Sequence, residues 1–153
     1  MDGEIEGYTK LGFVKAVVDR DNRVVLQFLP KVVCQAVKPK TAAQVVEALR
    51  GVVSDEGTAK EAEVPGYEVA GKTGTAQKIS NGVYAKDKHR ASFIGFLPAD
   101  RPEFLVSILV DEPKGKIYYG GQVAAPAFSR IATQVAEQLN LNRGTVVARR
   151  TTL

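Results

Sequence analysis

The stretch P-G-Y-E-V-A-G-K-T-G-T-A-Q-K, residues 65–78, can form either of two incompatible structures around one lysine. The fold of the chain depends on which of them it adopts. From Gly66 it satisfies the phosphate-loop pattern G-x-x-x-x-G-K-[ST], which ends in Gly71, Lys72 and Thr73. A phosphate loop follows a buried strand and opens a helix. If the stretch is instead one extended strand, Thr73 and Thr75 project from the same face. The flanking sequence decides between these structures.

The flanks do not suit a phosphate loop. Residues 60–65, K-E-A-E-V-P, are too polar for a buried strand, and Gly74, Thr75 and the turn signal Asn81-Gly82 make a poor helix start. One feature favours nucleotides, because the apolar run 105–112 ends in two acids and resembles a magnesium-holding strand. A nucleotide-binding protein therefore stays as the weaker alternative.

The extended structure has the features of an edge strand that receives an extended ligand. Gly71 and Gly74 remove side chains, so another backbone can approach closely. The hydroxyls of Thr73 and Thr75 have the spacing needed to bind one carboxylate, and Lys72 adds positive potential beside them. The alternative is a solvent-facing strand with ordinary surface residues. A bare K-T-G motif does not decide between the two.

The remaining patterns predict an α+β fold with an antiparallel sheet and packed helices. Residues 13–19 and 23–28 form a β-hairpin pattern. Residues 91–97 and 104–110 are apolar runs joined by a connection too short for a parallel crossover, so they should be antiparallel neighbours.

Two helices are expected. The first begins at Thr41 as its N-cap, and Gly57 closes it. The second runs from about Val123 to Leu139, with Pro126 in its first turn. The apolar stripe of this second helix consists of Phe128, Ile131, Val135 and Leu139. Residues 143–153 read as a loose tail.

Composition excludes several classes of protein. The chain has 153 residues and a net charge of +4, without the dense basic patch that nucleic-acid binding requires, so no nucleic-acid partner is expected. No apolar run reaches the roughly 18 residues needed to span a bilayer. The lone Cys34 and lone His89 cannot form a zinc site, and His89 lies among charged residues typical of a solvated loop. We expect no metal and no cofactor.

At residues 69–77, V-A-G-K-T-G-T-A-Q, the sequence resembles the transpeptidase domain of class B penicillin-binding proteins, relatives of the serine β-lactamases. The resemblance extends over about residues 7–141. The other segments that carry it are residues 51–53, 57–59, 92–100, 110–113 and 119–128. We therefore expect residues 1–153 to be part of such a domain.

The resemblance implies a serine-type D,D-transpeptidase that cross-links peptidoglycan and binds β-lactams. A nucleophilic serine would attack the penultimate D-Ala carbonyl of a stem peptide. Lys72 would supply positive charge and help to organise proton transfer, and Thr73 and Thr75 would bind the substrate carboxylate. Gly74 completes the motif, and the backbone N–H of Thr75 would be an oxyanion-hole donor. The location implied is the extracytoplasmic face of the bacterial cell envelope, with the membrane anchor outside this chain.

The family's nucleophile motif S-x-x-K and second motif S-x-N do not occur in the sequence. The residues three positions after its serines are Gly57, Val83, Gly95, Val110 and Ala132. Both motifs precede residue 13 in the family's order, so we expect a C-terminal part of the domain that is inactive alone and partners the remainder of the domain. An exposed sheet edge could promote a homodimer. The alternative is a non-catalytic binding or assembly module on the same scaffold.

Overall fold

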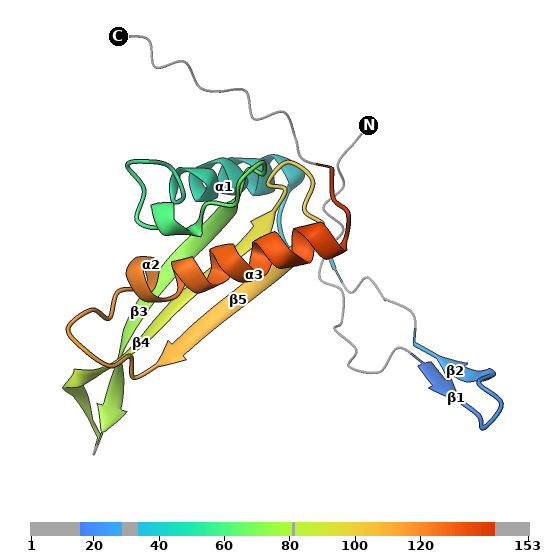
Figure 1. Cartoon of the computed structure of the whole chain (residues 1–153), viewed down its shortest axis with the longest axis horizontal. Helices are drawn as coiled ribbons and strands as arrows, with labels where there is room; N and C mark the ends of the chain where they lie inside the picture. Colours follow the sequence, from blue (N-terminus) through green and yellow to red (C-terminus); the bar gives the residue numbers. More distant parts are fainter. Residues whose placement is uncertain (1–15, 29–33, 81, 143–153) are drawn as a thin grey trace, which may run out of the picture. The chain divides into compact units, whose positions relative to one another are not determined.

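A computed structural model describes residues 16–28, 34–80 and 82–142. The chain divides into two compact units, residues 1–45 and 46–153, which are considered separately (Figure 1). No helix in the described ranges is long and apolar enough to cross a membrane. The predicted tail, residues 143–153, lies outside the described residues.

The first unit contains the predicted β-hairpin, which is confirmed. Strands β1 (Ala16–Val18) and β2 (Val24–Gln27) are antiparallel. In the turn, the carboxylate of Asp19 accepts hydrogen bonds from the backbone N–H groups of Asp21 and Arg23, both at 2.9 Å. Asn22 has a φ of 60°, a left-handed conformation that asparagine tolerates better than most residues. Residues 13–15 of the predicted hairpin lie outside the described residues.

Helix α1 (Pro39–Gly51) exists, but both of its predicted ends were wrong. It begins at Pro39 rather than at a Thr41 cap, because proline suits the first helical turn, where its missing N–H would have no partner. It ends at Gly51 rather than Gly57. Val52 and Val53 continue the apolar spacing but lie in hydrogen-bonded turns instead.

The second unit is built on a three-stranded antiparallel sheet of order β3-β4-β5. Its strands are β3 (Ala70–Ser80), β4 (Val83–Leu97) and β5 (Phe104–Asp111). The predicted antiparallel pairing of the two apolar runs is confirmed. Strand β4 is longer than its apolar part, because residues 83–84 and 89–90 also pair with the end of β3. His89 therefore lies in a strand, not in the solvated loop that its charged neighbours suggested.

Helices α2 (Gly120–Val123) and α3 (Ala125–Gln138) cover one face of this sheet (Figure 1). The chain thus forms two helices where one was predicted, with Ala124 between them. A one-turn 3₁₀ helix, η1 (Lys60–Ala62), packs beside α3. Pro126 lies in the first turn of α3, as predicted.

The core lies between the sheet and α3, and it uses a different helix face from the one predicted. Phe128 is fully buried and contacts Phe93 edge-on, with ring centroids 4.8 Å apart. Ile131 and Leu139 of the predicted stripe are 41% and 52% exposed. The other buried residues of α3 are Ala125, Ala132 and Ala136. Their short side chains allow α3 to lie close to the sheet. This close packing favours the alanine face of the helix over the predicted apolar stripe.

Candidate functional site

The K-T-G segment lies in the middle of β3, at an edge of the sheet. Within the described ranges, β3 pairs with β4 on one side and with no strand on the other. An edge strand presents unpaired backbone groups that can bind an extended peptide. Lys72 and Thr73 are within the strand and no helix follows them, so the geometry of a phosphate loop is absent at this place.

Packing within the sheet explains why residues 71 and 74 are both glycine. A Cβ atom on Gly71 would lie 2.5 Å from the ring of Phe93, and one on Gly74 would lie 2.5 Å from the hydroxyl of Ser92. Both positions therefore leave room for side chains of the neighbouring strand β4. The close approach of a ligand backbone stays a prediction.

The hydroxyls of Thr73 and Thr75 share the helix-covered face of the sheet, as the alternation predicted. Thr73 pairs with Phe93 and Thr75 with Ala91, and both of these β4 residues are fully buried under the helices. Paired residues in an antiparallel ladder point to the same face. The two threonines are therefore two residues apart along one face, at the rim of the helix layer.

Each threonine hydroxyl has a partner from a distant segment. The Oγ1 atoms of Thr73 and Thr58 are 3.4 Å apart, and the backbone N–H of Gly120 donates to Oγ1 of Thr75 at 3.2 Å. Thr58 precedes η1 and Gly120 begins α2, so these partners come from different segments. The sequence did not predict either contact. Its only indication that these residues matter was that residues 57–59 and 119–128 both lie in segments that carry the family resemblance.

Lys72 alternates with the threonines and pairs with Ile94 on β4. Its ammonium group turns back along the strand and donates to the carbonyl oxygen of Thr73 at 3.0 Å and to its Oγ1 at 3.4 Å. No carboxylate pairs with Lys72 in the described part of the chain. The positive charge is therefore free to attract an anionic ligand to this strand.

The start of α2 sits unusually close to β3 and β4. A Cβ on Gly120 would lie 2.2 Å from the carbonyl oxygen of Ser92 and 2.6 Å from that of Gly74. A Cβ on Gly121 would lie 2.0 Å from the carbonyl oxygen of Thr58. Backbone atoms cannot move aside as flexible side chains can. Only glycine at both positions allows α2 to bring the Gly120 amide to Thr75.

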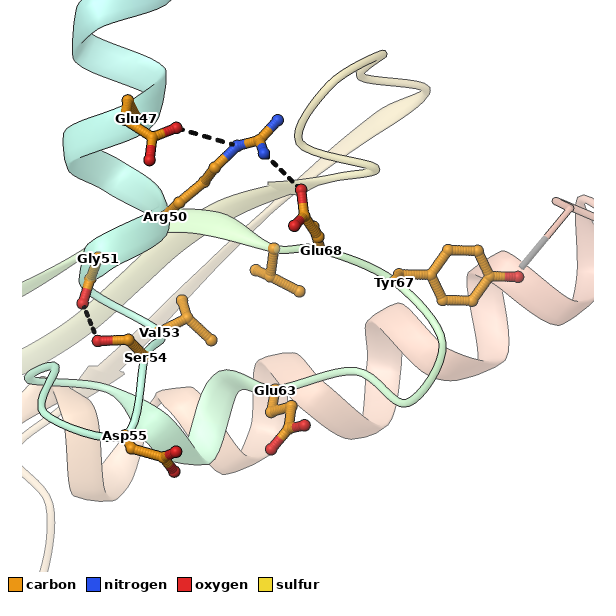
Figure 2. A pocket seen from close by; sticks show the side chains of 10 residues that line it. Glu47, Arg50, Gly51, Val53, Ser54, Asp55, Glu63, Tyr67 and Glu68 are labelled. Carbon is orange, nitrogen blue, oxygen red and sulfur yellow. Dashed lines mark hydrogen bonds and ion pairs between the residues drawn. The ribbon is translucent and has the colours of Figure 1, made fainter. Parts of the chain in front are cut away.

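A pocket of about 330 Å³ lies beside the chain that leads into β3 (Figure 2). Arg50, near the end of α1, donates to Glu68 at 2.5 Å and lies 3.9 Å from Glu47. The hydroxyl of Tyr67 donates to the carbonyl oxygen of Leu141 at 2.7 Å. These contacts hold the segment before β3 from two sides. The pocket walls reach Val69 but not the K-T-G segment.

Ion pairs join the three strands at the far end of the sheet. Lys78 contacts Asp111 at 2.8 Å and Glu112 at 2.7 Å, and Arg90 contacts Asp111 at 2.9 Å. Hydrogen bonds from Lys78 and then Arg90 lower the pKa of Asp111, and the bond from Lys78 lowers that of Glu112. The hydrogen bonds to Asp111 and Glu112 raise the pKa of Lys78.

His89, on the sheet, makes an aromatic contact with a residue outside it. His89 stacks on Tyr118, with ring centroids 3.9 Å apart and planes inclined by 15°. In the ranges that the structure describes, no three histidine, cysteine or acidic side chains gather as a metal site would require.

The sequence matches the family model described as the penicillin binding protein transpeptidase domain over residues 6–133. Stage V sporulation protein D of Bacillus subtilis is 47% identical over 107 residues, which are 70% of this chain and 16% of that protein. The probable peptidoglycan D,D-transpeptidase PenA of Neisseria gonorrhoeae is 46% identical over 94 residues, 61% of this chain and 16% of that protein. The chain thus spans about a sixth of these relatives.

Solved structures with the same fold agree with this match. Penicillin-binding protein 3 of Mycobacterium tuberculosis, complexed with ampicillin, has a TM-score of 0.75 and 32% identity, over 88% of this chain and 32% of that one. The TP domain of penicillin-binding protein 3 from Burkholderia pseudomallei has a TM-score of 0.68 and 41% identity, over 75% and 35% of the two chains. The predicted α+β fold with an antiparallel sheet and packed helices is confirmed.

Proposed function

This chain belongs to the penicillin-binding protein transpeptidase family, and we propose that it forms the substrate-binding wall of a peptidoglycan D,D-transpeptidase. The observation that carries the proposal is the edge strand β3, on which Lys72, Thr73, Gly74 and Thr75 lie together. Two threonine hydroxyls share one face, and the ammonium group beside them has no carboxylate partner among the described residues. A relative in Neisseria carries the name of this activity, and a structural neighbour is complexed with ampicillin.

The proposed reaction is acyl transfer through a serine. The serine oxygen bonds to the carbonyl carbon of the penultimate D-Ala, the peptide bond breaks, and the terminal D-Ala leaves with a proton on its nitrogen. The amine of a neighbouring stem peptide then attacks the ester carbonyl and forms the cross-link, the ester bond breaks, and a proton of that amine passes to the serine oxygen. A β-lactam would acylate the same serine through its strained amide.

Residues of β3 would act on the terminal carboxylate and on the reacting carbonyl. The hydroxyls of Thr73 and Thr75 donate hydrogen bonds to the carboxylate, and Lys72 adds the positive charge that favours an anion. The N–H of Thr75 stabilises the negative oxygen that develops in the transition state. Substrate bound as an added strand at the β3 edge would place its backbone beside these groups.

We propose that the nucleophile lies outside residues 1–153, since no serine in them begins S-x-x-K. We propose that residues 1–153 alone are not acylated and that they act with the remainder of a transpeptidase domain. We also propose that this domain works at the extracytoplasmic face of the cell envelope, where peptidoglycan is cross-linked. If the complete gene encodes no S-x-x-K, the same edge strand favours a non-catalytic module that binds peptidoglycan peptides.

Labelling by a fluorescent penicillin tests the proposal. The protein from the complete gene should be labelled at a serine outside this segment, and the 153-residue chain should not be labelled. Lys72→Ala should slow labelling by about 10–10²-fold, the usual effect of removing a charged group that binds an anion. Lys86→Ala, at an exposed position of β4, is the matched control and should leave the rate unchanged. Labelling of the isolated chain, or full reactivity of Lys72→Ala, would contradict the proposal.

A further inference from the structure

We propose that Thr58 is a positioning residue that sets the hydroxyl of Thr73 as a hydrogen-bond donor, while the Gly120 amide does the same for Thr75. The inference rests on the proposed function, because it concerns how the same strand recognises a carboxylate. The direction of the hydrogen bonds on the two hydroxyls supports it. A threonine hydroxyl has one proton to donate and two lone pairs that accept.

At Thr75 the direction is determined by chemistry. The backbone N–H of Gly120 can only donate, so Oγ1 of Thr75 accepts this bond of 3.2 Å and keeps its own proton. That proton is then the group that Thr75 can offer to a ligand. A carboxylate, which only accepts hydrogen bonds, fits such a donor.

At Thr73 the same arrangement is built from two side chains. The ammonium group of Lys72 can only donate, so it uses one lone pair of Oγ1 of Thr73 at 3.4 Å. The hydroxyl of Thr58, also at 3.4 Å, can either donate or accept. When a carboxylate takes the proton of Thr73, Thr58 rotates its hydroxyl to donate into the second lone pair. Both hydroxyls of the strand then present protons to the same anion.

The backbone around Thr58 is held firmly enough for this role. The N–H of Gly57 donates to Ser54 and that of Ala59 to Val52, both at 2.9 Å, and Ala59 is fully buried. The carbonyl oxygen of Thr58 faces Gly121, at a distance that leaves no room for a Cβ. The hydroxyl of Thr58 is therefore carried to Thr73 by packing, across a gap of 15 residues in the sequence.

Binding of two probes to the 153-residue chain tests the inference without requiring acylation. The probes are N-acetyl-D-alanyl-D-alanine and its C-terminal amide, which differ only in the carboxylate, and NMR shifts of the β3 amides report each dissociation constant. The original chain should prefer the carboxylate. Thr58→Val should reduce the ratio of the two constants by about 5-fold, a typical value for one hydrogen bond. Thr58→Ser, which keeps the hydroxyl, should preserve the ratio to within about 2-fold.

The outcomes separate the two proposals. If the original chain prefers the carboxylate and Thr58→Val keeps the same preference, the role of Thr58 is wrong and the proposed function stands. If the original chain binds neither probe, or both equally, the carboxylate site on β3 is wrong and both proposals fail. Should Thr58→Val not fold, as judged by its amide spectrum, the comparison of Thr58→Ala with Thr58→Ser decides in the same way.

Discussion

Two halves of the β3–β4 ladder are held by different forces. In the proximal half, residues 70–75 of β3 pair with residues 91–96 of β4, and Ala70, Ala91 and Phe93 are completely buried. In the distal half, Gln77 pairs with His89, and after a register shift residues 79–80 pair with residues 83–84, where Tyr84 is 68% exposed. Partly exposed ion pairs of Lys78 stabilise this half.

The proximal half is the half that suits the carboxylate site we propose on the K-T-G segment. Donors that are already in place bind more tightly, since ordering them during binding costs conformational entropy. Close packing under α2 and α3 supplies that order, because a buried backbone between fixed neighbours has few alternative positions. Exposed ion pairs contribute little by comparison. Three substitutions, ordered by the size of the loss expected from each, test this contrast.

Removing the main core side chain should have the largest effect. Phe128→Ala leaves a cavity against Phe93 and should lower the free energy of unfolding by about 3–5 kcal/mol. Ile131→Ala, one turn along the same helix but 41% exposed, should cost clearly less. Urea denaturation of both variants measures the difference. Equal losses would show that the proximal half does not depend on the buried face of α3.

Adding one carbon at the start of α2 should have the next largest effect. Gly120→Ala places a Cβ against the carbonyl oxygens of Ser92 and Gly74, which should cost about 1–3 kcal/mol of unfolding free energy by overpacking. It should also displace the donor of Thr75. The matched control is Gly51→Ala, where a Cβ meets nothing within 4 Å and stability should stay nearly constant. A Gly120→Ala variant as stable as this control would refute the close packing of α2.

The distal ion pairs should give the smallest effect, with a defined pH dependence. Because Lys78 lowers the pKa of Asp111 and Glu112, their pairing stabilises the fold fully above the ordinary values of 3.8 and 4.5. This contribution is lost as the pH falls through the lower values of the folded state. Lys78→Met should therefore lower Tm at neutral pH, and its difference from the original chain should disappear in acid.

Thermal denaturation between about pH 7 and about pH 2 measures this dependence. Lys86→Met removes an exposed lysine of β4 that has no ion pair in the described part of the chain, so its Tm should match the original at every pH. A Lys78→Met difference that persists unchanged at the acid end would show that Lys78 acts through packing of its alkyl chain instead of its charge.

Much of the fold was predictable because it depends on short-range patterns. The hairpin in the first unit, the strand through Lys72 and the antiparallel pair of apolar runs all follow from alternation and turn residues. Helix ends were predicted less well. Pro39 begins α1 and Gly51 ends it, although apolar spacing continues through Val53. The spacing of apolar residues is the same in a helix and in the turns that follow it, so it does not show where the helix ends.

That Thr73 and Thr75 share a face beside Lys72 was predictable from the sequence, because strand alternation is a local property of the backbone. The surroundings of the two threonines depend on how distant segments pack. Thr58 and Gly120 reach the two hydroxyls across 15 and 45 residues of sequence, and α3 buries alanines in preference to Ile131. Such contacts depend on how closely whole elements pack, and no local period of the sequence encodes that distance.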